Sequence, residues 1–252
     1  MALHRRDLVW DGCLNVRDLG GHATRNGGET RYGRVVRADS VRQLTEAGWK
    51  AVADYGVRTV VDLRGDHELA DDPPRELPFD VVHVPFMETN EAEWDVIVAE
   101  LEAMPVDAAD AASETRDAYL IFLEHFRANA AAAVRAVARA PEGAVVIHCV
   151  GGKDRTGLLC AFLLDLAGVG IEAIAADYAL SEERLQPRHD EWIAAAETEA
   201  ERERLRRMLA SPADAIIGVF DELERRFGGV PEFLRAGGLG EDDLALAVGR
   251  LR

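Results

Sequence analysis

The sequence predicts an α/β fold with a central, mainly parallel sheet of about four to five strands, flanked by helices. The first observation is a set of short apolar runs rich in β-branched residues, which are typical of buried strands. The second is that segments with helical periodicity separate these runs, and such alternation favours parallel strands joined by helical crossovers. The third is that the last third of the chain shows helical periodicity alone, which predicts extra C-terminal helices.

The first elements follow from local patterns. Residues 12–37 are rich in Gly, Asn and Arg, which favours loops and short strands, with 35–37 as a strand candidate. Apolar residues then recur at helical spacing over 44–55, and Gly56 supplies a stop signal, so a helix is predicted there. The rest of this region is predicted as a buried strand at 58–63, a loop at the Asp-Asp-Pro-Pro sequence of 71–74, and a strand at 80–84.

Helices dominate the remainder. One is predicted over 91–103 and ends before Pro105, and a second begins with Ser113 as its N-cap. The apolar run at 144–147 predicts a further strand, and a glycine-containing loop follows at 150–155. Further helices are predicted at 130–140, 156–167, 171–179, 183–196, 199–210 and 213–227.

Composition limits the classes of function. The chain has 252 residues and a net charge of -17, which argues against binding to nucleic acid or stable association with an anionic membrane. We expect a single domain over 1–252, because one α/β domain of this length can bury a full core. The first eleven residues carry no apolar signal region and the three cysteines form no disulfide framework, so we expect a cytoplasmic protein. Export by an unconventional route stays open.

The negative charge is concentrated in one segment. Residues 86–117 hold ten acidic residues and a single basic one, Arg116. The predicted helix in this segment carries Trp94, Val98 and Leu101 on one face, together with Ile97. That face is either the lining of a lid or an ordinary packing surface, and the second interpretation is the simpler one. We expect 86–117 to form an acidic helical insertion.

The most informative stretch runs from His148 to Gly157 and reads His-Cys-Val-Gly-Gly-Lys-Asp-Arg-Thr-Gly. A buried strand delivers Cys149 into a tight loop, and Arg155 follows six positions later at the start of a helix. Backbone N–H groups of such a loop, together with the helix N-terminus, form a cradle for a tetrahedral oxyanion. The guanidinium of Arg155 matches two phosphate oxygens, and the positive surroundings favour Cys149 as a thiolate nucleophile.

Lys153 is unusual in this chain, which contains only two lysines among 29 basic residues. A compact ammonium can add positive charge to the loop where a second guanidinium would crowd Arg155. A chance occurrence is the alternative interpretation.

The stretch resembles the signature of the cysteine-dependent protein tyrosine phosphatase superfamily. Together with Asn-Val-Arg-Asp-Leu-Gly-Gly at 15–21 and Val-Val-Asp-Leu-Arg at 60–64, it is similar to the atypical bacterial and fungal branch, whose members act on phosphotyrosine, phosphoserine or phosphothreonine, and phosphoinositides. The resemblance implies a hydrolase that uses no metal or cofactor. It implies a phosphotyrosine protein or a phosphoinositide as substrate and inorganic phosphate as product.

The resemblance also implies residue roles. Cys149 would form the phosphocysteine intermediate, Arg155 would bind phosphate, and Thr156 would hydrogen-bond the thiolate. His148 would orient the loop. Apart from the resemblance, the charges of Arg17 and Asp18 are expected to pair with neighbours rather than to act in catalysis. The phosphate-binding set would be Val150, Gly151, Gly152, Lys153, Asp154, Arg155 and Thr156.

The sequence offers more than one candidate for the general acid. Asp154 is the first candidate because it lies beside the phosphate, although it could instead brace the loop. Asp62 is the second candidate, and an ion pair with Arg64 that supports the cradle is its alternative role. Asp117 has the spacing of the acid in other superfamily members, but it falls on a predicted helix where a surface charge is the simpler interpretation.

Three other functions compete with this one. Rhodanese-type sulfur transfer also uses a cysteine loop after a strand, but the Arg-Thr-Gly at the helix start disfavours it. A catalytically weak phosphate-binding module would be expected to lack Cys149 or Arg155. An inositol polyphosphate phosphatase would need a broad basic pocket, which the charge distribution does not obviously supply. Cys13 and Cys160 are most simply core thiols, and a reversible disulfide of either one with Cys149 stays open.

Overall fold

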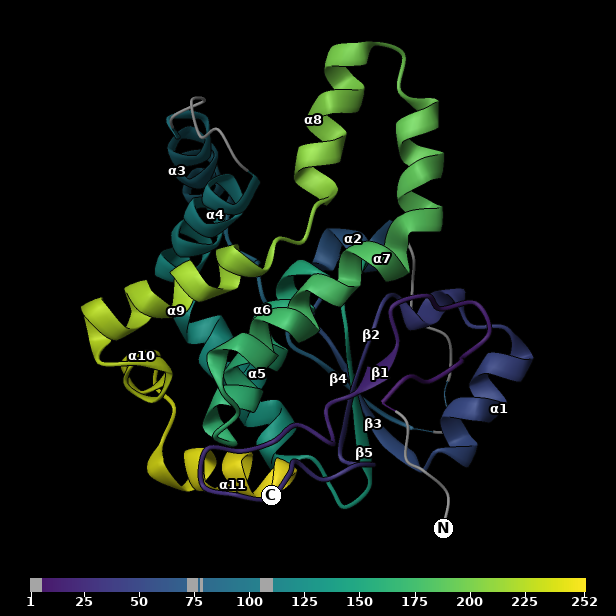
Figure 1. The fold of residues 1–252 in the computed structure, drawn as a ribbon, viewed down its shortest axis with the longest axis vertical. Coiled ribbons are helices and arrows are strands. Elements are labelled where there is room, and N and C mark those ends of the chain that lie inside the picture. Colours follow the sequence, from purple (N-terminus) through teal and green to yellow (C-terminus); the bar gives the residue numbers. More distant parts are fainter. Residues whose placement is uncertain (1–5, 72–76, 78, 105–110) are drawn as a thin grey trace.

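A mainly parallel sheet forms the centre of the molecule. The computed structural model describes residues 6–71, 77, 79–104 and 111–252. Within these residues the sheet has five strands in the order β1-β2-β5-β3-β4 (Figure 1). The strands are β1 (Arg17–Asp18), β2 (Val35–Ala38), β3 (Val57–Asp62), β4 (Asp80–His83) and β5 (Ala144–His148). Only β1 and β2 pair antiparallel, so the predicted α/β class is confirmed.

Helices surround this sheet. In the described part of the chain, none of them combines the length and the apolar character that a membrane crossing requires. A short 3-10 turn at Val41–Gln43 precedes α1 (Glu46–Asp54). The others are α2 (Asp66–Asp71), α3 (Glu91–Glu102), α4 (Ala111–His125), α5 (Arg127–Arg139), α6 (Asp154–Leu166), α7 (Ile171–Ala195), α8 (Glu199–Leu209), α9 (Ala213–Phe227), α10 (Val230–Ala236) and α11 (Glu241–Leu251).

Strand β5 is central because its residues are apolar on both faces. All five of its residues are buried, and Val146 pairs with Val36 on one side and with Val60 on the other. Alternate side chains of β5 enter two separate apolar clusters, one on each face of the sheet. A strand that is apolar on both faces has to lie inside a sheet covered by helices on both sides.

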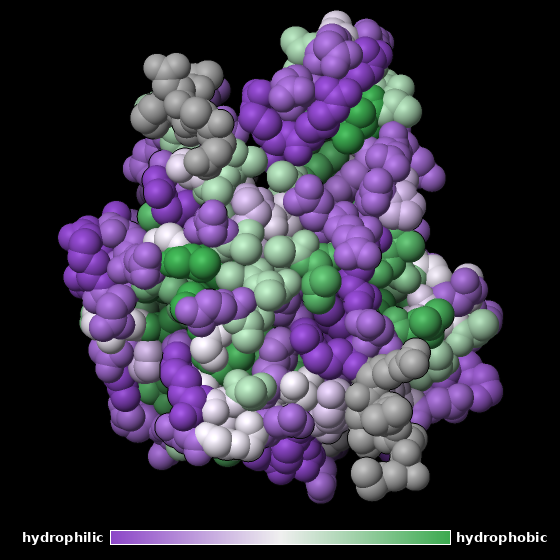
Figure 2. All heavy atoms as spheres, in the orientation of Figure 1, coloured by the Kyte–Doolittle hydropathy of each residue, from purple (hydrophilic) through white to green (hydrophobic). Residues whose placement is uncertain are grey.

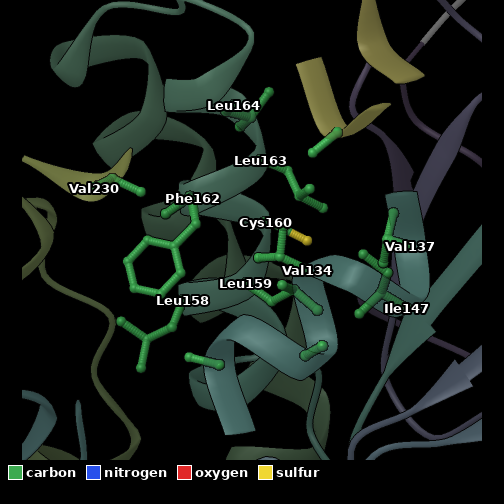
Figure 3. Close-up of a cluster of buried hydrophobic side chains, with 14 of the residues drawn as sticks. Val134, Val137, Ile147, Leu158, Leu159, Cys160, Phe162, Leu163, Leu164 and Val230 are labelled. Carbon is green, nitrogen blue, oxygen red and sulfur yellow. The ribbon is translucent and has the colours of Figure 1, made fainter. Parts of the chain in front are cut away.

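The larger core is built around α6. This helix buries nine of its residues, and Figure 3 shows its side chains directed toward α5 and β5 on one side and toward α10 on the other. Burial of each Leu or Phe side chain contributes about 1.5–3 kcal/mol to folding. Because α6 directly follows the loop after β5, this core fixes the position of that loop.

Some of the predicted helices differ from those in the structure. Residues 171–195 form one continuous helix, where a break was predicted around residue 181. Ser181 is fully buried and lies on the helix face that meets Arg17 and Arg37, so its polarity marks an internal contact rather than a turn. Helix α2 was not predicted, because its six residues bury no side chain and give no apolar periodicity. Of the loop predicted at 71–74, only Asp71 is described, and Pro105 also lies outside the described residues.

Helical projections rise on two sides of the loop after β5. Helices α3 and α4 form one of them, and the end of α7 with α8 forms the other (Figure 1). Figure 2 shows hydrophilic side chains over the outer surface of α8 and less polar surface at the base of the gap. The carboxyl ends of the parallel strands and the N-terminus of α6 therefore lie beneath a gap between helices.

A buried ionic cluster joins the sheet to α7. The guanidinium groups of Arg17 on β1 and Arg37 on β2 contact the carboxylate of Asp177 on α7, at 3.1 and 2.8 Å. All three residues are at most 2% exposed. The nearby arginines outweigh the effect of burial and hold the pKa of Asp177 well below its usual range. Burial and, after it, the neighbouring Arg37 together lower the pKa of Arg17 to about 9.

The cluster predicts a large stability loss for Asp177→Asn. The substitution leaves two buried guanidinium groups without a charged partner, and breaking such a pair costs about 3–5 kcal/mol. Because the folded-state pKa is depressed, this contribution is present above about pH 4 and is lost as pH falls below it. Urea unfolding measures the effect. The exposed Asp190 on the same helix is the matched control, and an equal loss in Asp190→Asn would contradict the assignment.

Candidate functional site

The cysteine loop, residues 149–155, follows β5 and includes the first two residues of α6. Helix α6 begins at Asp154, two residues earlier than predicted, with Lys153 as its N-cap. Asp154 and Arg155 therefore lie in the first turn, where the unpaired N–H groups carry partial positive charge. Cys149 lies at the start of the loop and is only 3% exposed. A strand, a loop and a helix N-terminus thus meet around one thiol.

The carbonyl groups of the loop are held by the surrounding scaffold. The side chain of Asn15 and that of Arg37 donate to the carbonyl oxygen of Gly152, at 3.0 and 2.7 Å. The backbone N–H of Ser40 donates to the carbonyl oxygen of Val150 at 2.8 Å. In a trans peptide the N–H points opposite to the C=O, so these contacts turn the following N–H groups away from the scaffold. The resulting row of donors is suited to an anion.

The two successive glycines of the loop, Gly151 and Gly152, differ in whether the structure leaves room for a side chain. Gly152 has φ +64°, and a Cβ there would come within 2.3 Å of the carbonyl oxygen of Ala38. Gly151 has no such limit, because a Cβ there would meet nothing within 4 Å. The loop therefore requires glycine at 152 for its close approach to β2 but not at 151.

Arg155 is oriented by a carboxylate that the sequence analysis did not identify. Glu68 on α2 accepts two hydrogen bonds from the guanidinium, and the Nη2–Oε1 distance is 2.8 Å. Burial raises the pKa of Glu68, but the hydrogen bonds from Arg155 outweigh burial and lower it below its usual value. The pair holds the guanidinium at the rim of the loop. Glu68 lies in a polar stretch of an acidic chain, so nothing in the sequence marks it out.

Asp154 is held from the side by a tyrosine. Its Oδ1 accepts a hydrogen bond from the Tyr119 hydroxyl of α4 at 2.5 Å, and that hydroxyl lies 2.8 Å from the hydroxyl of Tyr178 on α7. The sequence indicated Tyr119 only as part of an apolar helix face. Asp154 itself is half-exposed and faces the gap between the helices.

The ammonium of Lys153 is held by the end of α8. Its ammonium donates to the carbonyl oxygens of Met208 and Ala210 at 2.6 and 2.9 Å, and lies 3.4 Å from Asp154. These carbonyls belong to the C-terminal end of α8, where a cation is favourable. Lys153 therefore fastens the loop to α8.

Asp62 lies beneath the loop in a closed ionic cluster. Its carboxylate contacts Arg64 at 2.7 Å and the Nε2 of His148 at 3.5 Å. Burial raises the pKa of Asp62, but the hydrogen bonds from Arg64 outweigh burial and keep it below the usual value. Burial also lowers the pKa of His148, which favours a neutral ring. The structure thus contains the Asp62–Arg64 ion pair, which is the alternative to a general-acid role for Asp62.

The other candidate residues from the sequence, which include Thr156, Arg17 and Asp18, each have different surroundings in the structure. The hydroxyl of Thr156 is buried and has no hydrogen-bond partner among the described residues. The three cysteines are free, and burial raises the pKa of Cys160 to about 12 and that of Cys13 well above its usual range. Arg17 pairs with Asp177, and Asp18 accepts from the Gly20 N–H and the Tyr55 hydroxyl.

A cavity of about 880 Å³ opens above the cysteine loop. One wall comes from α3 and α4, and it includes Trp94 and Phe122. Ile97 is fully buried behind this wall, so the apolar face of α3 both packs and lines the cavity. The remaining lining residues are His67, Glu68, Met87, Val98, Leu101, Glu102, Met104, Glu114, Thr115, Ala118, Tyr119, Lys153, Asp154, Arg155, Arg204, Arg207 and Met208.

Comparison with known proteins decides the family. The family model described as the tyrosine phosphatase family matches residues 8–251, nearly the whole chain. The chain belongs to the tyrosine phosphatase family. The resemblance seen in the sequence is confirmed, and the cysteine loop with its cavity is the candidate active site of this family member.

Two relatives show how far the similarity extends. A tyrosine-protein phosphatase of Nostoc commune is 34% identical over 154 residues, which cover 60% of this chain and 49% of that protein. The chain thus matches about half the length of this relative. The triple specificity protein phosphatase PtpB of Mycobacterium tuberculosis is 26% identical over 261 residues, which cover 91% of this chain and 93% of PtpB.

The two glycines give a matched test of the loop in this tyrosine phosphatase family member. We expect Gly152→Ala to weaken binding of inorganic phosphate, the ligand expected for the loop from the sequence, by at least about fivefold, since backbone strain of this kind costs about 1–3 kcal/mol. Gly151→Ala should bind phosphate within about twofold of the wild type. Titration calorimetry measures both. Equal affinities in the two variants would show that the loop conformation does not depend on residue 152.

Proposed function

We propose that this protein is a phosphatase that hydrolyses phosphate monoesters through a phosphocysteine intermediate on Cys149. The observation that supports this most strongly is the placement of a buried thiol in a loop whose carbonyls are tied back, directly before a helix N-terminus and Arg155. Such a loop presents N–H donors to three phosphate oxygens, and Arg155 supplies a charged fork at the rim. Val150 to Thr156 then form the phosphate site.

In the first step the Cys149 thiolate attacks phosphorus. The S–P bond forms as the bond between phosphorus and the leaving oxygen breaks, and Asp154 gives its proton to that oxygen. The loop N–H groups and Arg155 stabilise the charge on the equatorial oxygens. Asp154 suits this role because it is half-exposed, lies in the cavity and belongs to the phosphate-binding loop itself.

In the second step water attacks phosphorus. The Asp154 carboxylate takes a proton from this water, the S–P bond breaks, the thiolate is regenerated and inorganic phosphate is released. Thr156 lies in the first turn of α6 with its hydroxyl buried and unbonded among the described residues, so it is available as a donor to the departing sulfur.

Asp62 is better suited to support than to proton transfer. Arg64 engages both of its oxygens, and the lowered pKa keeps it ionised. Through His148 it holds the end of β5, from which Cys149 projects. We assign Asp62 and His148 to positioning the loop.

The cavity favours substrates with an apolar body attached to the phosphate. Apolar side chains of α3 and α4, among them Trp94 and Phe122, flank the loop on one side. The family supports phosphoproteins or phosphoinositides as the general substrate class, and we propose a phosphotyrosine protein first.

We further propose one domain over 1–252 with 86–117 as a lid insertion, and a cytoplasmic location in keeping with three free cysteines.

A substrate panel tests the reaction. We expect turnover of a phosphotyrosine peptide above that of a phosphothreonine peptide or a soluble phosphoinositide, and a loss of at least about 10⁴-fold in Cys149→Ser. Release of inorganic phosphate is the measurement, and circular dichroism checks that the variant folds. Activity retained by Cys149→Ser, or no turnover of any of the three substrates, would rule out the proposed reaction.

The pH dependence of kcat/KM for the peptide identifies the acid. The wild type should lose activity on the basic side as the acid deprotonates. Asp154→Asn should lack this basic limb and lose about 10²–10⁴-fold at the optimum. Asp62→Asn should keep the limb, because it acts through the loop. The reverse assignment would follow if only Asp62→Asn abolished the basic limb.

A further inference from the structure

Two buried tyrosine hydroxyls form a chain that ends on Asp154. Tyr119 on α4 and Tyr178 on α7 are 3% and 1% exposed, and their rings meet edge to face at 6.2 Å. The Tyr119 hydroxyl contacts the Oδ1 of Asp154 at 2.5 Å and the Tyr178 hydroxyl at 2.8 Å. Three elements that are distant in sequence therefore converge on one carboxyl group.

The direction of the hydrogen bonds follows from the number of protons. Tyr119 has a single hydroxyl hydrogen, which is donated to Asp154, so the Tyr178 hydroxyl has to donate to the oxygen of Tyr119. Such a chain polarises each bond in turn and strengthens the last one. Burial raises the pKa of both tyrosines well above the usual value, so both stay donors throughout the working pH range.

We propose that Tyr119 is a positioning residue for proton transfer, which fixes the Oδ1 of Asp154 so that the other oxygen, Oδ2, carries the proton to the leaving group. The inference rests on the proposed role of Asp154 as general acid. An acid whose proton can occupy either oxygen spends part of its time misdirected, and the fixed hydrogen bond removes that freedom. Tyr178 in turn orients the hydroxyl of Tyr119.

Other charged groups also face Asp154. The Lys153 ammonium lies 3.4 Å from Oδ1, but two backbone carbonyls of the α8 end hold it. Arg155 adjoins Asp154 in the chain and is held by Glu68. Neither cation is released when the Tyr119 hydroxyl is removed, so that substitution isolates its contribution. The remaining ionisable groups around the cavity are His67, Glu102, Glu114, Arg204 and Arg207.

The test is Tyr119→Phe assayed with two substrates that differ in their need for a proton. The leaving group of phosphotyrosine is a phenol with a pKa of about 10 and requires an acid. The leaving group of dinitrophenyl phosphate departs as a stable anion and does not. We expect kcat/KM for phosphotyrosine to fall about 10- to 100-fold, a fraction of what general acid catalysis contributes, and kcat/KM for dinitrophenyl phosphate to change less than about threefold. The basic limb should also move to higher pH, because the carboxylate loses a donor.

A matched control is available in the same fold. Tyr55 donates its hydroxyl to Asp18, so Tyr55→Phe removes the same kind of bond without touching Asp154. Its ratio of kcat/KM for the two substrates should equal that of the wild type. Tyr178→Phe should shift the ratio in the same direction as Tyr119→Phe, but less. Because the ratio is taken on one preparation, a reduced fraction of folded protein does not alter it.

The possible outcomes separate the inference from the proposed function. An equal loss with both substrates in Tyr119→Phe, or no loss with either, would overturn the positioning role. If Asp154→Asn shows the leaving-group dependence and neither tyrosine variant does, only this inference fails. If wild-type protein hydrolyses neither substrate, the proposed function fails instead.

Discussion

The cysteine loop depends on two buried arginines that share one carboxylate. Arg17 and Arg37 have almost no contact with solvent, and Asp177 is the carboxylate that both contact. Their remaining donors have to find oxygen acceptors nearby, because an unpaired buried donor costs about 1–3 kcal/mol. Arg37 meets this need with the Gly152 carbonyl, and Arg17 meets it with the Asn15 side chain, which itself donates to Gly152. The demand of buried cations for acceptors thus shapes the loop.

The strands, the family and the cysteine loop could be predicted because their signals are local. A β-branched run such as 58–63 defines a buried strand within a few residues, and the Asp62–Arg64 pair spans only two positions. Gly152 likewise belongs to the motif at 148–157, which is recognisable from ten consecutive residues. In each case the residues that explain the structure are neighbours in the chain.

The contacts that orient the acid and the arginine could not be predicted in the same way. Tyr119 reaches Asp154 across 35 positions, and Glu68 reaches Arg155 across 87. A tyrosine on an amphipathic helix predicts a core residue, and a glutamate in an acidic chain predicts a surface charge. Their roles depend on how α2 and α4 pack around the loop, which no local pattern specifies. The same holds for Lys153, whose ammonium serves the backbone of α8.

The fastening of Lys153 has a consequence for how substrates arrive. The Lys153 ammonium already interacts with two backbone carbonyls and with Asp154, and Glu68 balances the charge of Arg155. Two cations and two carboxylates at the mouth of the loop leave little net field beyond the cavity, in a protein whose overall charge is -17. Electrostatic steering therefore contributes little to the encounter rate, and discrimination rests on contacts made after entry. Such a site captures dianions by fit at short range, against the general repulsion from a protein of this net charge.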